Sequence, residues 1–172
     1  SQRFAAEELE KYVRLITGAG LSAKVVIDSP DSELGDEGFR LYVAEESLHI
    51  VGGKRGALYG VYEVLERFGG CGWYSATCEV IPRATAFAVP GNLDVTEKPA
   101  FPMRSTNRSA IPKNPAFAAH LRFNGLIPTM DEKHGGVAYR FVRGGAGFCH
   151  TFDAQISPKV WYDSHPEYFC LR

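Results

Sequence analysis

The sequence has no long apolar run and no extended basic cluster, and each absence excludes a class of protein. A membrane-spanning helix needs about 20 consecutive apolar residues, and no stretch of the chain approaches that length. The formal net charge is −1, and basic residues do not cluster beyond Lys54 and Arg55. We therefore expect neither a membrane span nor nucleic acid as a partner.

Cysteine is sparse: the chain has four, Cys71, Cys78, Cys149 and Cys170. Because no two of them form a Cys-x-x-Cys pair, we predict no structural zinc site, and no motif points to another metal or to a cofactor. We interpret all four as buried free thiols, since free cysteine is among the most buried residue types. A Cys71–Cys78 disulfide is the alternative, if residues 72–77 form a tight loop.

The composition of the chain predicts a packed globular protein. Hydrophobic residues make up 45% of the 172 residues and charged residues 23%, which is typical of a folded core and not of disorder. This length suits one domain of ordinary size, or one small domain followed by part of another. We find no internal repeat and no low-complexity segment.

The first part of the chain alternates helical and strand patterns. Residues 4–16 carry apolar side chains on one helical face, and Thr17 and Gly18 end this helix. Residues 23–27 form a short β-branched strand, and the polar residues 28–37 form a loop.

A hairpin and a second helix follow. Residues 39–43 and 48–51 alternate apolar and polar side chains, as in half-buried strands. Residues 54–68 place Leu58, Val61 and Leu65 on one helical face, with the charged residues Glu63, Glu66 and Arg67 on the other side. Together these elements predict a mixed sheet covered by two helices, with Trp73 and Tyr74 packed at the end of the second helix.

Beyond this helix the elements become shorter. We predict extended pieces at residues 79–82 and 86–89, and a polar linker at residues 95–99. After the linker, residues 115–123 have a helical pattern. Further extended segments are predicted at 126–127, 139–142 and 148–152. This order of strand, helix and strand matches the opening of a β/α barrel.

Two segments resemble known carbohydrate-active enzymes. Residues 38–74, above all residues 55–62 (RGALYGVY), resemble the small α/β domain that precedes the catalytic barrel in family 20 hexosaminidases, family 67 α-glucuronidases and related bacterial proteins of unknown function. Residues 98–104 (KPAFPMR) resemble the segment that enters the barrel in family 20. The resemblance implies an accessory domain at residues 1–96, lacking its first strand, and the N-terminal part of a barrel at residues 97–172.

The resemblance also implies a function and a location. It implies a secreted or periplasmic bacterial protein whose full-length form hydrolyses glycosidic bonds with carboxylates, and a carbohydrate as its substrate. A full barrel needs about 250 residues, far more than follow Pro99, so we expect this chain to be a fragment without glycosidase activity of its own. The alternative is a non-catalytic carbohydrate-binding or interaction protein that retains the architecture.

Four residues are candidates for the site. By resemblance, Arg104 ends the first barrel strand and hydrogen-bonds sugar hydroxyls, which suits the fixed fork of guanidinium donors. By resemblance too, His150 supports the active site. Asp131 and Glu132 have the composition of the family 20 catalytic pair. The corresponding alternatives are an ion-paired structural arginine, a structural histidine and a solvated turn.

Overall fold

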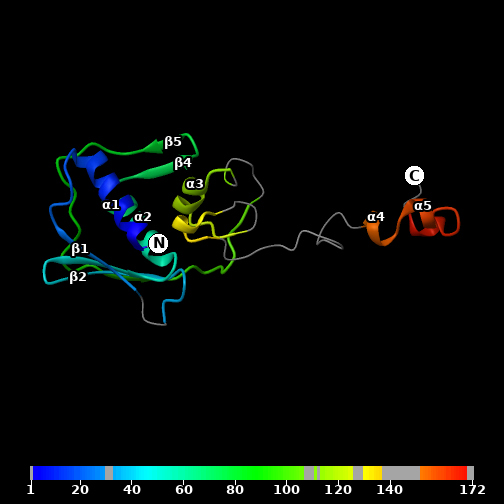
Figure 1. Cartoon of the computed structure of the whole chain (residues 1–172), viewed down its shortest axis with the longest axis horizontal. Helices are drawn as coiled ribbons and strands as arrows, with labels where there is room; N and C mark the ends of the chain where they lie inside the picture. The colour runs from blue at the N-terminus through cyan, green and yellow to red at the C-terminus, as the bar shows by residue number, and fades with distance from the viewer. Residues whose placement is uncertain are drawn as a thin grey trace. The chain divides into compact units, whose positions relative to one another are not determined.

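The computed structural model describes residues 2–29, 33–106, 111, 113–125, 130–136 and 152–169. The contacts divide the chain into two compact units, Ser1–Arg140 and Phe141–Arg172. The first unit contains a mixed sheet and a layer of helices (Figure 1). A mixed α/β architecture is therefore confirmed, whereas its assignment as a hexosaminidase-type accessory domain and a β/α barrel stays a prediction.

The first helix and strand form where their patterns predict. Helix α1 spans Gln2–Thr17, and its apolar face is buried. This face consists of Ala5, Leu9, Tyr12, Val13 and Ile16. Strand β1, Lys24–Asp28, follows and joins the sheet through parallel pairing with β3. The amphipathic spacing of α1 thus corresponds to real burial against the core.

Among the described residues, the sheet has four strands in the order β1–β3–β2–β6. The hairpin is confirmed: β2, Phe39–Ala44, pairs antiparallel with β3, Ser47–Gly52. Glu45 and Glu46 make the two-residue turn with φ of 49° and 57°, the left-handed geometry that matches the twist of the flanking strands. Strand β6, Asp94–Glu97, pairs antiparallel with the other side of β2.

Strand β6 corrects the linker predicted around residues 95–99. Its polar residues indicated a loop, but an edge strand tolerates polar side chains because one face lies toward solvent. Arg40 and Asp94 form a bidentate ion pair across the β2–β6 ladder, with both N–O distances 2.8 Å. Arg67 reaches Glu97 at 3.1 Å from helix α2. Partners far away in the sequence therefore turn a polar segment into a strand.

Helix α2, Gly56–Arg67, is the centre of the first unit. Leu58, Val61 and Leu65 are fully buried, as predicted. Glu63, predicted on the exposed side, is only 8% exposed and makes ion pairs with Arg67 and Arg122. The sheet packs against one side of this helix. Helix α1 and the segment around α3 pack against other sides, so little of the helix is exposed.

A short hairpin and two cysteines follow α2. Strands β4, Gly72–Ser75, and β5, Cys78–Val80, pair antiparallel. Trp73 is buried as predicted, but Tyr74 is 72% exposed because its side chain points to the opposite face of β4. Cys71 is a buried free thiol and Cys78 an exposed one, so these two form no disulfide, and the predicted burial of Cys78 is wrong.

Only part of the later predictions falls on described residues. Helix α3, Pro115–His120, is shorter than the predicted 115–123, because Arg122 adopts a left-handed φ of 57° that ends the helix. Residues 86–89 form no strand, and Phe152, predicted to be extended, starts helix α4 (Phe152–Gln155). The strands predicted at 126–127 and 139–142, and the cysteines Cys149 and Cys170, lie outside the described residues.

The described part of the second unit, residues 152–169, contains three short helical elements. After α4 come α5, Pro158–Trp161, and the 3₁₀ helix η2, Pro166–Tyr168. The imidazole of His165 stacks on Tyr168 with ring centroids 4.7 Å apart, and Trp161 contacts the same histidine. These aromatic contacts connect α5 to η2 within this unit.

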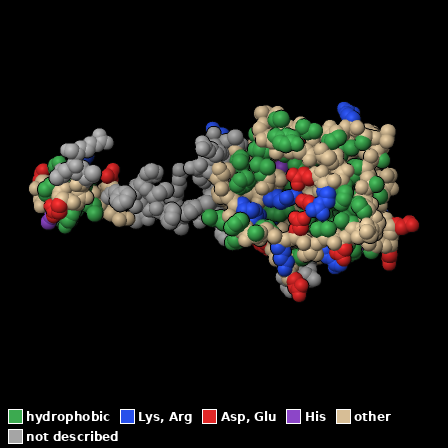
Figure 2. All heavy atoms as spheres, turned by 180° about the vertical axis from the view of Figure 1, so that it is seen from behind, with side chains coloured by type: hydrophobic (Ala, Val, Ile, Leu, Met, Phe, Trp, Pro, Cys, Tyr) green, Lys and Arg blue, Asp and Glu red, His purple; other side chains and the backbone are tan. Residues whose placement is uncertain are grey.

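The domain boundary predicted after residue 96 stays a prediction, and its position lies inside the first compact unit, Ser1–Arg140. Residues beyond it pack against α2 in the first unit, through the Arg122–Glu63 pair and through contacts between α2 and α3. Figure 2 shows acidic and basic side chains side by side on one face of this unit. Within the part of the chain that the structure describes, no helix has the length and apolar character of a membrane span.

Candidate functional site

A buried polar cluster lies where four segments of the first unit meet. We call it the Glu37 junction, and it consists of Glu37, Arg55, Tyr59, Arg104 and Asn124. Glu37 accepts hydrogen bonds from Arg104 Nη2 at 3.0 Å and from Asn124 Nδ2 at 2.9 and 3.0 Å. Arg55 Nη1 lies 3.6 Å from the other carboxylate oxygen. Among the residues that the structure describes, two guanidinium groups therefore share one carboxylate in a largely buried place.

Arg104 is held in one orientation by this junction. Its Nε donates to the carbonyl of Arg122 at 2.8 Å, and its Nη1 donates to the carbonyl of Phe101 at 2.7 Å. Its backbone N–H donates to Asn124 Oδ1 at 2.9 Å. Contrary to the prediction, Arg104 ends no strand, because its main chain pairs with Asn124 in an irregular segment. The predicted alternative, an ion pair with a carboxylate, is present.

Arg55 and Tyr59 are the two members of the junction at the start of helix α2. Arg55 lies just before α2, is 2% exposed and donates from Nε and Nη2 to the carbonyl of Gly136. The Tyr59 hydroxyl is buried without a hydrogen-bond partner among the described residues. Burial, together with the charge of Glu37, raises the pKa of Tyr59 to about 12, so the hydroxyl stays neutral. The guanidinium carbon of Arg104 lies 6.0 Å from the centre of the Tyr59 ring.

Residues 55–62, which carry much of the resemblance, have a packing role in this structure. A Cβ atom on Gly56 would lie 2.0 Å from the carbonyl oxygen of Gly38, and one on Gly60 would lie 2.8 Å from Ile50 Cγ2. Both glycines thus allow α2 to approach its neighbours closely. Tyr59 and Tyr62 are fully buried. The motif builds the helix–sheet contact and supplies Arg55 to the junction.

Asp131 and Glu132 begin a turn that ends at Gly136, whose carbonyl accepts hydrogen bonds from Arg55 of the junction. Asp131 caps the 3₁₀ helix η1, Glu132–His134, by accepting from the backbone N–H of His134 at 3.1 Å, and it also contacts the imidazole Nδ1 of that residue. Partial burial raises the pKa of Asp131, but the hydrogen bonds from His134 outweigh this effect and lower it below its usual value. Because the cap already engages its carboxylate, this geometry favours the turn interpretation.

The other predicted candidate, His150, lies outside the described residues. The structure instead brings together a set of groups that sequence reasoning missed. We call it the His120 cluster: Glu8, Tyr12, Tyr62, Trp73 and His120. His120 stacks on Trp73 with ring centroids 4.3 Å apart, and its Nε2 lies 3.4 Å from the Tyr12 hydroxyl. Tyr62 donates to Glu8 at 3.3 Å, and Trp73 Nε1 donates to Tyr12 at 3.1 Å.

The His120 cluster connects α1, α2, α3 and β4 through buried polar contacts. Its members are up to 112 positions apart in the sequence, so no spacing pattern joins them. The only sequence signal is a histidine in the last turn of a short amphipathic helix. Because its polar atoms are buried and partnered, the cluster fixes the position of α3 on the first two helices.

We expect acidification to destabilise the first unit through this cluster. Burial lowers the pKa of His120 below 6.5, against the opposing effect of Glu8. The unfolded chain therefore binds a proton more readily than the folded one, and the free energy of unfolding falls as pH drops below about 6.5, by at most about 1.4 kcal/mol per pH unit. Burial raises the pKa of Glu8, but hydrogen bonds from His120 and Lys11 lower it, so its contribution disappears only below pH 4.5.

Urea unfolding of the chain at pH 7.5, 6.5 and 5.5 checks this expectation. His120→Phe removes the titrating group and should flatten the pH dependence between 7.5 and 5.5, whatever its effect on stability at pH 7.5. His165→Phe, which changes a part-exposed histidine in the second unit, serves as the control. A pH dependence that is the same in His120→Phe and in the original chain would contradict the assignment.

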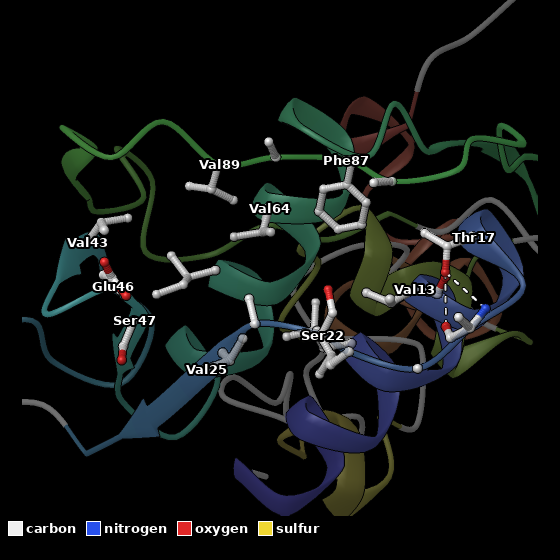
Figure 3. Close-up of a pocket in the computed structure, with 18 of the residues that line it drawn as sticks. Val13, Thr17, Ser22, Val25, Val43, Glu46, Ser47, Val64, Phe87 and Val89 are labelled. Atoms are coloured by element: carbon white, nitrogen blue, oxygen red, sulfur yellow. Dashed lines mark hydrogen bonds between the residues drawn. The ribbon is translucent and has the colours of Figure 1, made fainter.

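An apolar pocket of about 570 Å³ lies elsewhere in the first unit. Figure 3 shows Val13, Val25, Val64 and Phe87 around it, with Glu46 as its one charged residue. The Thr17 hydroxyl donates to the carbonyl of Val13 and is thus already engaged. Ser22, Ser47 and Thr85 also line the pocket, so its surface is mainly apolar with a few hydroxyl groups, and nothing in it singles out a carbohydrate.

Comparison with known protein families finds a match that covers more than half of the chain. Residues 73–172 match the model of a family described as a domain of unknown function, DUF4838. The match begins in β4 and includes Arg104, Asp131, Glu132 and His150. No curated protein matches the chain.

Proposed function

We propose that this chain, which belongs to the DUF4838 family of unknown function, is part of a carbohydrate-active, glycoside-hydrolase-like protein. In this proposal the full-length form hydrolyses glycosidic bonds of oligo- or polysaccharides outside the cytoplasm, and the rest of the first unit supports the sugar-binding segment around Arg104. The resemblance of residues 55–62 and 98–104 to hexosaminidases and α-glucuronidases motivates the proposal, and the fixed guanidinium of Arg104 is the structural observation that supports it.

A guanidinium held at three nitrogens suits recognition of a polyol. Glu37 and the carbonyls of Phe101 and Arg122 fix the plane of the Arg104 fork. Its side chain remains 20% exposed. A sugar with adjacent hydroxyls could then bind without a further loss of side-chain freedom, which is the advantage of a preorganised site. Arg55 and Tyr59 support this arrangement from beneath and have no direct contact with sugar in the proposal.

A second candidate function is non-catalytic carbohydrate binding. The capping role of Asp131 favours it, because His134 already engages the carboxylate that, by the family 20 resemblance, would orient the substrate. In this case the architecture and the arginine remain, and the hydrolytic chemistry does not. Turnover of aryl N-acetylhexosaminides or glucuronides by the full-length protein separates the two candidates, and loss of turnover in Glu132→Gln would restore the pair as catalytic.

We expect Arg104→Ala to weaken sugar binding by roughly ten- to a hundredfold, since a lost charged hydrogen bond costs about 1.5–3 kcal/mol. Arg104→Lys should recover little, because a point charge does not reproduce the fork. Calorimetric titration of the full-length protein with N-acetylhexosamine and glucuronate oligosaccharides measures both effects. Arg83→Ala, at an exposed arginine, is the control.

The melting temperature distinguishes binding from a purely structural role. Arg104→Ala also leaves Glu37 with one guanidinium fewer, so some loss of stability accompanies either outcome. An unchanged sugar affinity together with a lower melting temperature would reduce Arg104 to an ion-pair partner. Retained affinity in Arg104→Lys would also contradict the proposed fork recognition.

A further inference from the structure

The free edge of strand β1 is self-complementary. Within the described sheet β1 is an edge strand, paired with β3 on one side only. Its sequence is Lys24-Val25-Val26-Ile27-Asp28, with a basic residue at one end and an acidic residue at the other. An antiparallel pair of two such strands, centred on Val26, places Lys24 opposite Asp28 of the other copy at both ends.

The two faces of β1 meet the requirements of this pairing. Val25 and Ile27 pack against the core on the helical face, and Val26 does not, so Lys24, Val26 and Asp28 share the opposite face by strand alternation. In the antiparallel pair Val25 lies opposite Ile27 of the other copy. On one face, Lys24 and Asp28 of the two copies then form opposite-charge pairs on either side of Val26. On the other face, the aliphatic side chains of Val25 and Ile27 lie opposite each other.

Lys24 and Asp28 are available for partners in a second molecule. Both are exposed, and neither makes a side-chain hydrogen bond or an ion pair with any residue that the structure describes. The charged side chains of the opposite edge strand differ in this respect. Asp94 pairs with Arg40, and Glu97 pairs with Arg67.

The helical side of the same edge is incompletely covered. A hollow of about 320 Å³ lies between α1 and β1, lined by the side chains of Ala6, Leu9, Leu21, Val25 and Ile27 and by two polar residues of α1. Leu21 is 38% exposed there. Aliphatic side chains of a second β1 strand would cover this apolar surface, and unpaired strand edges with apolar flanks are known to pair with other chains.

Strand β6, at the other edge of the described sheet, lacks this self-complementarity. Full antiparallel overlap of two β6 strands would place Asp94 opposite Glu97 of the other copy at both ends. Like charges directly opposite each other destabilise a strand pair. One edge therefore opposes self-association, whereas β1 favours it.

We propose that β1 mediates dimerisation of this chain, by antiparallel pairing with β1 of a second copy around a twofold axis at Val26. The sheets of two molecules then join into one continuous eight-stranded sheet. The symmetry is isologous, since each copy contributes the same residues. Five residues per strand make a small contact, so the dimer is weak and forms at high protein concentration.

Charge variants test the register directly. Lys24→Glu places a glutamate opposite Asp28 of the other copy at both ends of the pair, and Asp28→Lys places two lysines opposite each other at both ends. Each variant alone should raise the dimer dissociation constant by roughly tenfold or more, because two attractive contacts become repulsive. An equimolar mixture of the two variants restores opposite charges at both ends and should form a heterodimer about as stable as the original dimer.

Sedimentation equilibrium of the full chain over micromolar to millimolar concentration measures these constants. Lys113→Glu, the same charge change at an exposed position outside the sheet, should leave dimerisation unchanged. Circular dichroism confirms that each variant is folded. The proposal is overturned by a chain that stays monomeric throughout this range, or by a dimer that Lys24→Glu and Asp28→Lys leave intact. Failure of the mixed variants to associate would equally reject it.

Discussion

Gly56→Ala should destabilise the first unit by about 3 kcal/mol or more, the upper part of the range for overpacking in a tight contact. The new Cβ would lie 2.0 Å from the carbonyl oxygen of Gly38, a backbone atom that cannot rotate away. The start of α2 is also tied to the loop before β2, because the N–H groups of Arg55 and Gly56 both donate to the carbonyl of Asp36. The helix and the loop must therefore separate to admit one methyl group.

Urea unfolding of the full chain, followed by circular dichroism, measures the effect. Gly91→Ala is the matched control, because a Cβ there would meet nothing within 4 Å. It should change the free energy of unfolding by less than about 0.5 kcal/mol. Equal stabilities of the two variants would show that α2 does not approach the loop as closely as described.

Leu58→Ala should lower the free energy of unfolding by about 2–5 kcal/mol. Leu58 is fully buried, and α2 packs against the sheet on one side and against α1 on another. Truncation removes apolar contacts and leaves a cavity that a helix surrounded by neighbours cannot easily fill by moving. Denaturant unfolding with a cooperative transition is again the measurement.

Leu15→Ala provides the comparison for this second change. Leu15 also lies in a helix, α1, but is 41% exposed. The change from leucine to alanine alters the intrinsic helix propensity equally at both positions, whereas only Leu58→Ala removes a fully buried side chain. We expect an effect below about 1 kcal/mol. A loss of less than about half a kcal/mol in Leu58→Ala would mean that the buried face of α2 is assigned incorrectly.

Prediction from sequence works best here where a local pattern and tertiary packing agree. The apolar spacing of α1 and the alternation in β2 and β3 each appear as burial in the structure. It is less successful where a distant partner decides the outcome. Glu63 is buried because Arg122 neutralises it, and β6 is a strand because β2 pairs with it.

The candidate site shows the same division. The sequence around Arg104 distinguishes this arginine from the others, and pairing with a carboxylate is one of its two predicted roles. That this carboxylate is Glu37, 67 positions earlier, is not predictable from spacing. The His120 cluster has no counterpart among the predictions, since Glu8, Trp73 and His120 come from three separate elements.

Residue type and periodicity report on contacts between residues that are close in the sequence. By themselves they therefore determined the helix α1, the hairpin β2–β3 and the buried face of α2. Arg104 was chosen because residues 98–104 resemble the segment that enters the barrel in family 20. The partners of charged groups, the order of the strands and the free edge of β1 depend on which distant segments meet. Only the tertiary structure decided these. Which charged groups are buried together, and which strand edge stays unpaired, are properties of the whole fold.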